Sequence, residues 1–138
     1  MSEQPFRVLP RLDDNNTFFW TSGQDGKLRF LRCQDDGTYV HPPAPVCPQC
    51  LGRALEPEAV SGRATVATFT INHQPWYPGL DPPYVIAIVE IEEQPSVRLM
   101  TNIIGCPPDE VRIGMGVRVV FEEYAGDTWL PFFEPAGD

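Results

Sequence analysis

Short runs of apolar and β-branched residues, separated by turn-forming residues, fill the chain from residue 60 onward. These runs lie at residues 62–71, 84–91, 97–104, 117–124 and 129–133. Valine, isoleucine, threonine and aromatic residues favour strands, so each run predicts a short β-strand. The run 84–91 is apolar almost without interruption, which predicts burial of both faces of its strand. With no segment suited to a crossover helix, the five strands predict a small closed antiparallel barrel of the OB type.

A short helix is predicted near the N-terminus. Residues 13–16 can cap it, the aromatic residues Phe18, Phe19 and Trp20 lie inside it, and Gly23 and Gly26 end it. Neighbouring side chains on a helix point about 100° apart, so three consecutive aromatic residues cannot all face one small core. We expect at least one of them to reach another surface. The alternative is that all three pack against the neighbouring parts of the same chain.

Two turns between the helix and the strands carry candidate metal ligands. Cys33 and Asp36 are three residues apart, and so are Cys47 and Cys50. Turns with this spacing can place four donors around one tetrahedral zinc ion without a large core. A carboxylate oxygen is a harder ligand than a thiolate, so Asp36 would make this site weaker than one with four cysteines. The sequence therefore predicts either one structural zinc ion or an empty ribbon held by apolar packing and by its prolines.

Three zones follow from these patterns. Residues 1–30 form an N-terminal helical arm, residues 31–58 a zinc-ribbon-like knuckle, and residues 59–138 the OB-fold barrel. The predicted fold class is thus mainly β. With 138 residues and 42% hydrophobic content, the chain can bury one modest core with a small appended unit.

Negative charge is concentrated in the last zone. The formal net charge is −9, and residues 59–138 carry eleven acidic against four basic residues. Phosphate backbones are bound by clustered lysine and arginine, so this distribution argues against a nucleic-acid partner.

The sequence also predicts a cytoplasmic protein with no membrane partner. No apolar stretch approaches the length of a membrane span, and the N-terminus lacks the basic and apolar regions of a signal peptide. Four cysteines, three of them at metal-ligand spacing, agree with a reducing compartment.

Several short motifs, in order along the chain, resemble one known family. They lie at residues 18–20, 26–33, 45–50, 61–66, 82–85, 112–116 and 119–121. Together they resemble the OB-fold, zinc-ribbon family first catalogued as domain of unknown function thirty-five, which is associated with acyl-CoA metabolism. The resemblance covers nearly the whole chain, and the chain departs from it at Asp36, where members usually have cysteine.

The resemblance implies a helical arm, a rubredoxin-like ribbon and a barrel that binds coenzyme A thioesters or, more often, a thiolase-like enzyme acting on them. Such partners include thiolases, hydroxymethylglutaryl-CoA synthase-like enzymes and lipid-transfer-protein-type aldolases, which cleave steroid side chains by retro-aldol chemistry. The segment 41–47 looks closest to the steroid aldolase branch, in which the same domain can be fused to a hot-dog-type enoyl-CoA hydratase. In all of these the partner supplies the catalytic residues.

The chain itself shows no predicted catalytic residue. Its two histidines, His41 and His73, lie among prolines with no nucleophile in register, and we expect the ring of His41 to face solvent. The simpler interpretation is that the chain acts by contact with other molecules and not by catalysis.

Three aromatic groups are the candidate contacts with a partner. The loop 72–83 comes first, because prolines stiffen it while Trp76 and Tyr77 offer rigid contact area, although it could instead cap the barrel. The aromatic helix comes second, and Trp129 with Phe132 comes third. The sequence thus predicts a non-catalytic accessory subunit of a thiolase-like aldolase or thiolase. The alternative is a stand-alone acyl-CoA-binding module. Such a module needs several basic residues for the phosphates of coenzyme A, and the barrel zone has only four.

Overall fold

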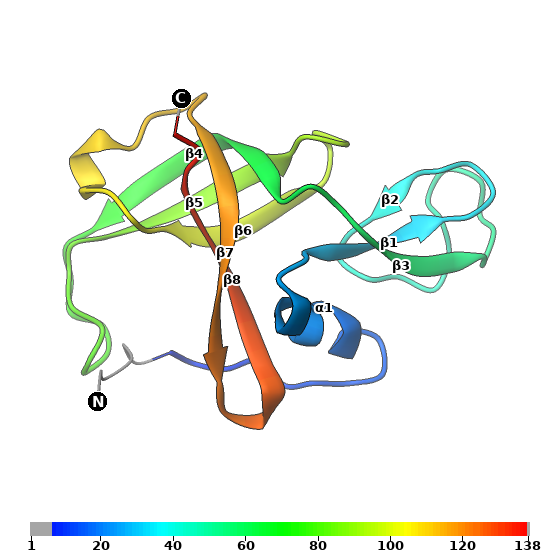
Figure 1. Ribbon diagram of the computed structural model, residues 1–138, viewed down its shortest axis with the longest axis horizontal. Helices are drawn as coiled ribbons and strands as arrows, with labels where there is room; N and C mark the ends of the chain where they lie inside the picture. The colour runs from blue at the N-terminus through cyan, green and yellow to red at the C-terminus, as the bar shows by residue number, and fades with distance from the viewer. Residues whose placement is uncertain (1–6, 138) are drawn as a thin grey trace.

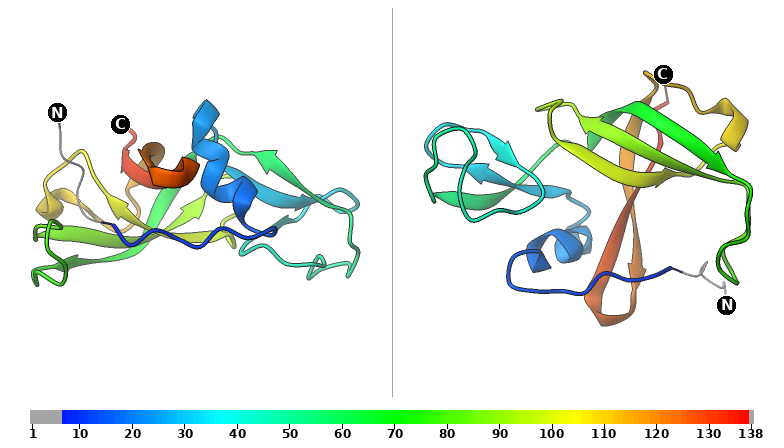
Figure 2. Two further views of the ribbon diagram at one scale, coloured as in Figure 1. Left: turned by 90° about the horizontal axis from the view of Figure 1, so that it is seen from below. Right: turned by 180° about the vertical axis from the view of Figure 1, so that it is seen from behind.

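A closed barrel, a small three-stranded sheet and one short helix make up the protein (Figure 1). The structure is a computed structural model and describes residues 7–137. The small sheet lies beside one end of the barrel, and the helix lies between the small sheet and a long hairpin of the barrel (Figures 1 and 2). No helix among the described residues is long and apolar enough to cross a membrane.

Helix α1 (Thr17–Thr21) begins directly after the predicted capping residues, and the 3-10 helix η1 (Ser22–Asp25) continues it. The Asp13 carboxylate accepts hydrogen bonds from the backbone of residues 15 and 16 and fixes the preceding turn. Gly26, in the left-handed conformation with φ of 77°, ends the helical segment, as glycine commonly does.

The small sheet has the strand order β2-β1-β3, and all of its pairs are antiparallel. Its strands are β1 (Arg29–Cys33), β2 (Tyr39–Val40) and β3 (Leu55–Ala59). The long connection from β2 to β3 holds the second of the two metal-ligand turns, and β1 leads directly into the first. The sheet therefore acts as the base from which both turns project.

The barrel has the strand order β4-β5-β6-β8-β7 and is closed by the pair β4 and β7. Its strands are β4 (Arg63–Asn72), β5 (Tyr84–Ile91), β6 (Arg98–Ile103), β7 (Gly116–Tyr124) and β8 (Thr128–Pro135). Two further 3-10 helices, η2 (Pro108–Glu110) and η3 (Ala125–Asp127), lie in its connections. All five predicted strands are present, so the predicted OB-type barrel is confirmed.

Two details of the predicted barrel were wrong. The pair β6 and β8 is parallel and meets only at Ile103 and Phe133, so the barrel is not antiparallel throughout. Strand β5 is not buried on both faces: its residues alternate regularly between buried and half-buried. The apolar residues on its outer side, Ile86 and Ile88, are only half-buried.

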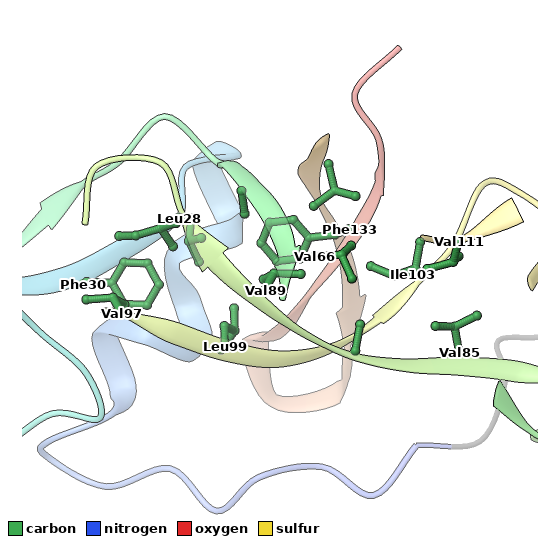
Figure 3. Packing of buried hydrophobic residues seen from close by; sticks show 14 of the residues in the cluster. Leu28, Phe30, Val66, Val85, Val89, Val97, Leu99, Ile103, Val111 and Phe133 are labelled. Atoms are coloured by element: carbon green, nitrogen blue, oxygen red, sulfur yellow. The ribbon is translucent and has the colours of Figure 1, made fainter. Parts of the chain in front are cut away.

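One hydrophobic core runs from the small sheet into the barrel. Figure 3 shows Phe30 of β1 and Leu28 beside Val97, which precedes β6, and the same cluster continues to Phe133 in the barrel. The side chain of Gln94 adds a polar link, because it is hydrogen-bonded to the backbone of Tyr39 in β2. The two sheets are therefore packed as one unit.

The helical segment approaches the hairpin β7–β8 very closely at Gly23. A Cβ atom at this position would lie 2.6 Å from the Phe121 ring and 2.7 Å from the Cβ atom of Trp129. Only glycine allows this approach, so Gly23 determines how the helical segment lies on the hairpin.

Candidate functional site

The two metal-ligand turns have the same backbone hydrogen bonds. Cys33 N–H bonds to the carbonyl of residue 38 at 2.7 Å, and Cys47 N–H bonds to the carbonyl of residue 52 at 2.9 Å. The carbonyl of each cysteine in turn accepts from the residue four positions later, Gly37 or Leu51. These two residues both have positive φ, 80° and 62°. The turns are thus two copies of one local structure, with leucine in the second where glycine is favoured.

Asp36 lies in the first turn where Cys50 lies in the second. The backbone N–H of Thr38 donates to Asp36 Oδ1 at 2.9 Å, and the N–H of Gly52 donates to Cys50 Sγ at 3.4 Å. Each ligand atom is therefore oriented by the N–H group two residues later, whether the atom is oxygen or sulfur. The carboxylate of Asp36 replaces the expected thiolate in position as well as in sequence.

The donor atoms of Cys33, Asp36, Cys47 and Cys50 all lie within 4.8 Å of one another. The Sγ atoms of Cys33 and Cys50 are 3.6 Å apart without a disulfide, and Cys47 Sγ is 3.4 Å from Asp36 Oδ2. Zinc–sulfur bonds of about 2.3 Å in a tetrahedron separate their donors by roughly 3.8 Å. The predicted ligand set is thus brought together, and its size and chemistry fit one zinc ion.

Proximity changes the acidity of these groups. The Thr38 N–H, followed by the Cys33 thiol, lowers the pKa of Asp36. For Cys50, the Gly52 N–H lowers the pKa of the thiol, but its contact with Cys33, desolvation, its contact with Cys47 and the charge of Asp36 outweigh this and raise it to about 11. The negative carboxylate of Asp36 thus opposes formation of the Cys50 thiolate, and a bound dication would remove that opposition.

The prediction that the ring of His41 faces solvent was wrong, because the residue is half-buried and its ring packs among aromatic side chains. Its ring lies 5.1 Å from the ring of Phe19 and 4.9 Å from that of Phe30, and its buried Nδ1 has no hydrogen-bond partner. Burial lowers the pKa of this imidazole to about 4. His41 is also absent from the four-residue donor cluster, so its role is to pack the helix against β1.

The predicted contact residues differ in exposure: two are exposed, three are half-buried, and two, described below, are buried. Trp76 and Tyr77 are 67% and 47% exposed, and Trp76 Nε1 donates to Asn72 Oδ1 at 2.9 Å, which orients the indole. Phe18, Trp20 and Trp129 are half-buried. The loop 72–83 therefore presents its aromatic side chains outward.

Phe19 and Phe132 are buried in the chain itself, at 3% and 5% exposure. Phe19 packs edge-on against Trp20, and the guanidinium of Arg7 covers the ring of Phe132 at 4.5 Å. The prediction that these two side chains contact a partner does not agree with their burial. All three helix aromatics pack on the core, as in the alternative interpretation of the helix.

An apolar groove of about 260 Å³ was not predicted. It lies between the N-terminal segment and the open seam of β6 and β8, and is lined by residues that include Val8, Ile86 and Met100. Arg7 donates to Asn102 Oδ1 at 2.8 Å at this groove. The alternation in residues 98–103 was a usable signal, because it places Met100 outward while its neighbours Leu99 and Thr101 are buried.

Comparison with known proteins gives matches along most of the chain. Residues 20–56 match the model of the rubredoxin-like zinc ribbon domain of ChsH2, and residues 57–122 match its C-terminal OB-fold domain. A DUF35 domain-containing scaffold protein of Methanocaldococcus jannaschii is 36% identical over 99 residues, which are 70% of this chain and 69% of the relative. The chain belongs to the DUF35 family. The predicted family is confirmed, and so is its combination of zinc ribbon and OB fold.

Two further proteins that this DUF35 chain resembles are named as parts of enzymes. A chain of the solved Ltp2-ChsH2(DUF35) aldolase superposes with a TM-score of 0.83 at 34% identity, covering 93% of this chain and 99% of that one. The 3-oxo-4,17-pregnadiene-20-carboxyl-CoA hydratase alpha subunit of Mycobacterium tuberculosis is 36% identical over 128 residues, 93% of this chain. The chain spans about 40% of the length of the curated hydratase alpha subunits that it matches.

Proposed function

We propose that this chain is a non-catalytic accessory subunit that binds and stabilises a thiolase-like aldolase or thiolase acting on acyl-CoA thioesters. The observation that carries the proposal is the superposition, over 93% of the chain, on a chain of the Ltp2-ChsH2(DUF35) aldolase. Three archaeal relatives are named scaffold proteins, which supports a role in binding another protein.

The chemistry of the described residues supports the same role. His41 is enclosed by aromatic rings, and His73 is exposed on the loop 72–83. A zinc ion held by Cys33, Asp36 and the two cysteines of the second turn would have four protein ligands and no open position for substrate. When bound, it would supply a structural cross-link between the two turns.

We propose a steroid acyl-CoA as the substrate of the complex, cleaved in its side chain by retro-aldol chemistry. The pregnadiene carboxyl-CoA in the name of the mycobacterial relative supports this substrate class. Since that relative is a hydratase subunit, a hot-dog-type enoyl-CoA hydratase is a second candidate partner. The four free cysteines fit a reducing, cytoplasmic location.

Co-expression tests this proposal. The chain is produced alone and together with the thiolase-like protein of the same organism whose gene lies nearest, and the products are compared by gel filtration. We expect a soluble hetero-oligomer that cleaves a β-hydroxyacyl-CoA steroid thioester, with little activity in either chain alone. Two separate monomer-sized peaks, or turnover by the chain alone, would contradict the proposal.

The groove favours one alternative, a stand-alone acyl-CoA-binding module. Its apolar walls are suited to an apolar ligand. Few basic residues in the barrel zone are available for the coenzyme A phosphates. Calorimetry with a steroid acyl-CoA distinguishes the two functions, since tight binding to the chain alone would support the module.

A further inference from the structure

The groove lies at the point where the barrel is least closed. Strands β6 and β8 are paired at a single pair of residues, Ile103 and Phe133. Buried residues of β6 and β8 form the floor of the groove, and Val8 of the N-terminal segment forms part of its rim. The floor is held by a hydrogen bond of 3.0 Å from Thr101 Oγ1 to the carbonyl of Pro131. The groove is therefore part of the fold at this seam.

Exposed apolar side chains gather on this side of the described chain. Seven large apolar side chains are exposed, and five of them lie on the N-terminal segment, on β6 or on the loop 72–83. These five are Val8, Leu9, Trp76, Tyr77 and Met100. Figures 1 and 2 place the loop beside the first described residues of the chain, at the same end of the molecule. Such a concentration is typical of a contact surface.

The apolar residues stand on the edges of the groove instead of lining a closed pocket. Val8 and Met100 are both 69% exposed although both border the groove. A small ligand is usually enclosed over most of its surface, and these side chains would stay in water around it. A protein segment inserted into the groove would cover both edges at once.

Acidic residues lie on two sides of the groove, and Arg98, exposed on the same face of β6 as Met100, is paired with Glu90. Among the described residues, Arg7 is the only cation in the lining of the groove, and it is already engaged by Asn102 and by the ring of Phe132. Arg7 also interacts with the hydroxyl of Tyr124, so the groove leads to the tip of the hairpin β7–β8, which carries Glu123 and Asp127. On the other side, the loop carries Asp81. A partner that fits this surface is apolar at its centre and basic at its margin.

We propose that this groove is where the partner enzyme inserts an apolar segment flanked by lysine or arginine residues, an inference that rests on the proposed function. Met100 and Val8 make the central apolar contacts, and Trp76 extends the contact along the loop. The acidic hairpin tip and loop orient the basic margin of the partner and increase the rate of association. The interface is thus centred on β6 and the N-terminal segment, and not on the metal-binding turns.

A matched pair of variants tests this inference. Met100 and Ile113 are 69% and 68% exposed, but only Met100 borders the groove. Binding of the purified thiolase-like subunit to each immobilised variant is measured by biolayer interferometry. We expect M100E to weaken binding at least tenfold and I113E to change it less than twofold. V8E should weaken binding as M100E does. Since Val8 lies in a segment outside any strand, V8E places no charge on a barrel strand.

The outcomes separate this inference from the proposed function. If the wild-type chain does not bind the subunit, the proposed function fails and the inference with it. If the wild type binds and both M100E and V8E bind equally well, the groove is not the interface although the function stands. If the chain alone binds a steroid acyl-CoA and M100E abolishes that binding, the groove serves a small ligand and the inference is overturned. Slower association of D127K, with a weaker dependence on salt, would support the acidic margin.

Discussion

The side chain of Gln94, which follows β5 of the barrel, makes two hydrogen bonds with the backbone of Tyr39 in the small sheet. Gln94 Oε1 accepts from the Tyr39 N–H at 2.9 Å, and Gln94 Nε2 donates to the Tyr39 carbonyl at 2.9 Å. The amide thus bonds both backbone groups of one residue, as a neighbouring strand would. It links the two sheets at the border of their common core.

Replacing Gln94 by alanine should weaken this link. Two backbone groups of a buried tyrosine would lose their partners, and we expect Q94A to lower the free energy of unfolding by about 1–3 kcal/mol. Urea unfolding followed by tryptophan fluorescence measures the change. Gln49, exposed on the second metal-ligand turn, gives the control variant Q49A, which should change stability by less than about 0.5 kcal/mol. Equal stabilities of Q94A and wild type would refute the link.

Asp36 should act as the fourth metal ligand. We expect one zinc ion per purified chain by mass spectrometry of metals, and removal of zinc with a chelator should lower the melting temperature. D36C should increase zinc affinity at least about tenfold, because thiolate is the softer ligand. D36N can keep the hydrogen bond from Thr38 but loses the negative charge, and it should bind zinc more weakly than wild type. If D36C alone retains zinc, the native turns fold without an ion.

His41 should make stability depend on pH. Its pKa is about 4 in the folded chain and 6.5 when unperturbed, so the unfolded state takes up the proton first as pH falls. The contribution is therefore fully present above about pH 6.5 and is lost progressively between about pH 6.5 and pH 4, by about 3 kcal/mol at most.

The measurement compares urea unfolding at pH 7 and pH 4.5 for wild type and H41F, which keeps a ring in the aromatic cluster. We expect the decrease between the two pH values to be about 2 kcal/mol smaller in H41F. H73N, at the exposed histidine, should retain the wild-type decrease. Parallel pH profiles of H41F and wild type would show that the His41 ring is not protected from protonation.

Gly23 should not tolerate a side chain. G23A would place a methyl group within 2.7 Å of the Phe121 ring and force the helical segment away from the hairpin β7–β8. We expect a loss of about 1–3 kcal/mol of stability by thermal unfolding. In the control G116A, the nearest atom to the new methyl group is 3.9 Å away, so the packing need not change. Similar melting temperatures for G23A and G116A would contradict this account.

The local elements could be predicted from the sequence because local patterns encode them. The strand β5 (Tyr84–Ile91) has the predicted bounds, the helix begins after residues 13–16 although no side chain caps it, and four predicted ligands lie in one cluster. The spacing within each of the two turns, Cys33 to Asp36 and Cys47 to Cys50, was the signal for the cluster, because each pair belongs to one tight turn. Features within a single turn or strand thus follow from a few neighbouring residues.

Features assembled from distant segments could not be predicted in this way. The burial of His41 depends on Phe19 and Phe30, which the helix and β1 bring to it. Phe132 is covered by Arg7, more than a hundred positions earlier in the chain. The parallel pair of β6 and β8 follows from the order of strands in the barrel, which no local pattern encodes.

The shared core also limits how this chain can be recombined with others. The border between the two matched family segments, at residues 56 and 57, falls inside β3 (Leu55–Ala59). A graft joined there would separate Phe30 from Val97, which lie side by side in Figure 3, and would break a strand. The ribbon and the barrel must therefore be transferred as one unit, with the splice site outside both. The hydratase alpha subunits agree with this, since 93% or more of the chain aligns with a single stretch of each longer polypeptide.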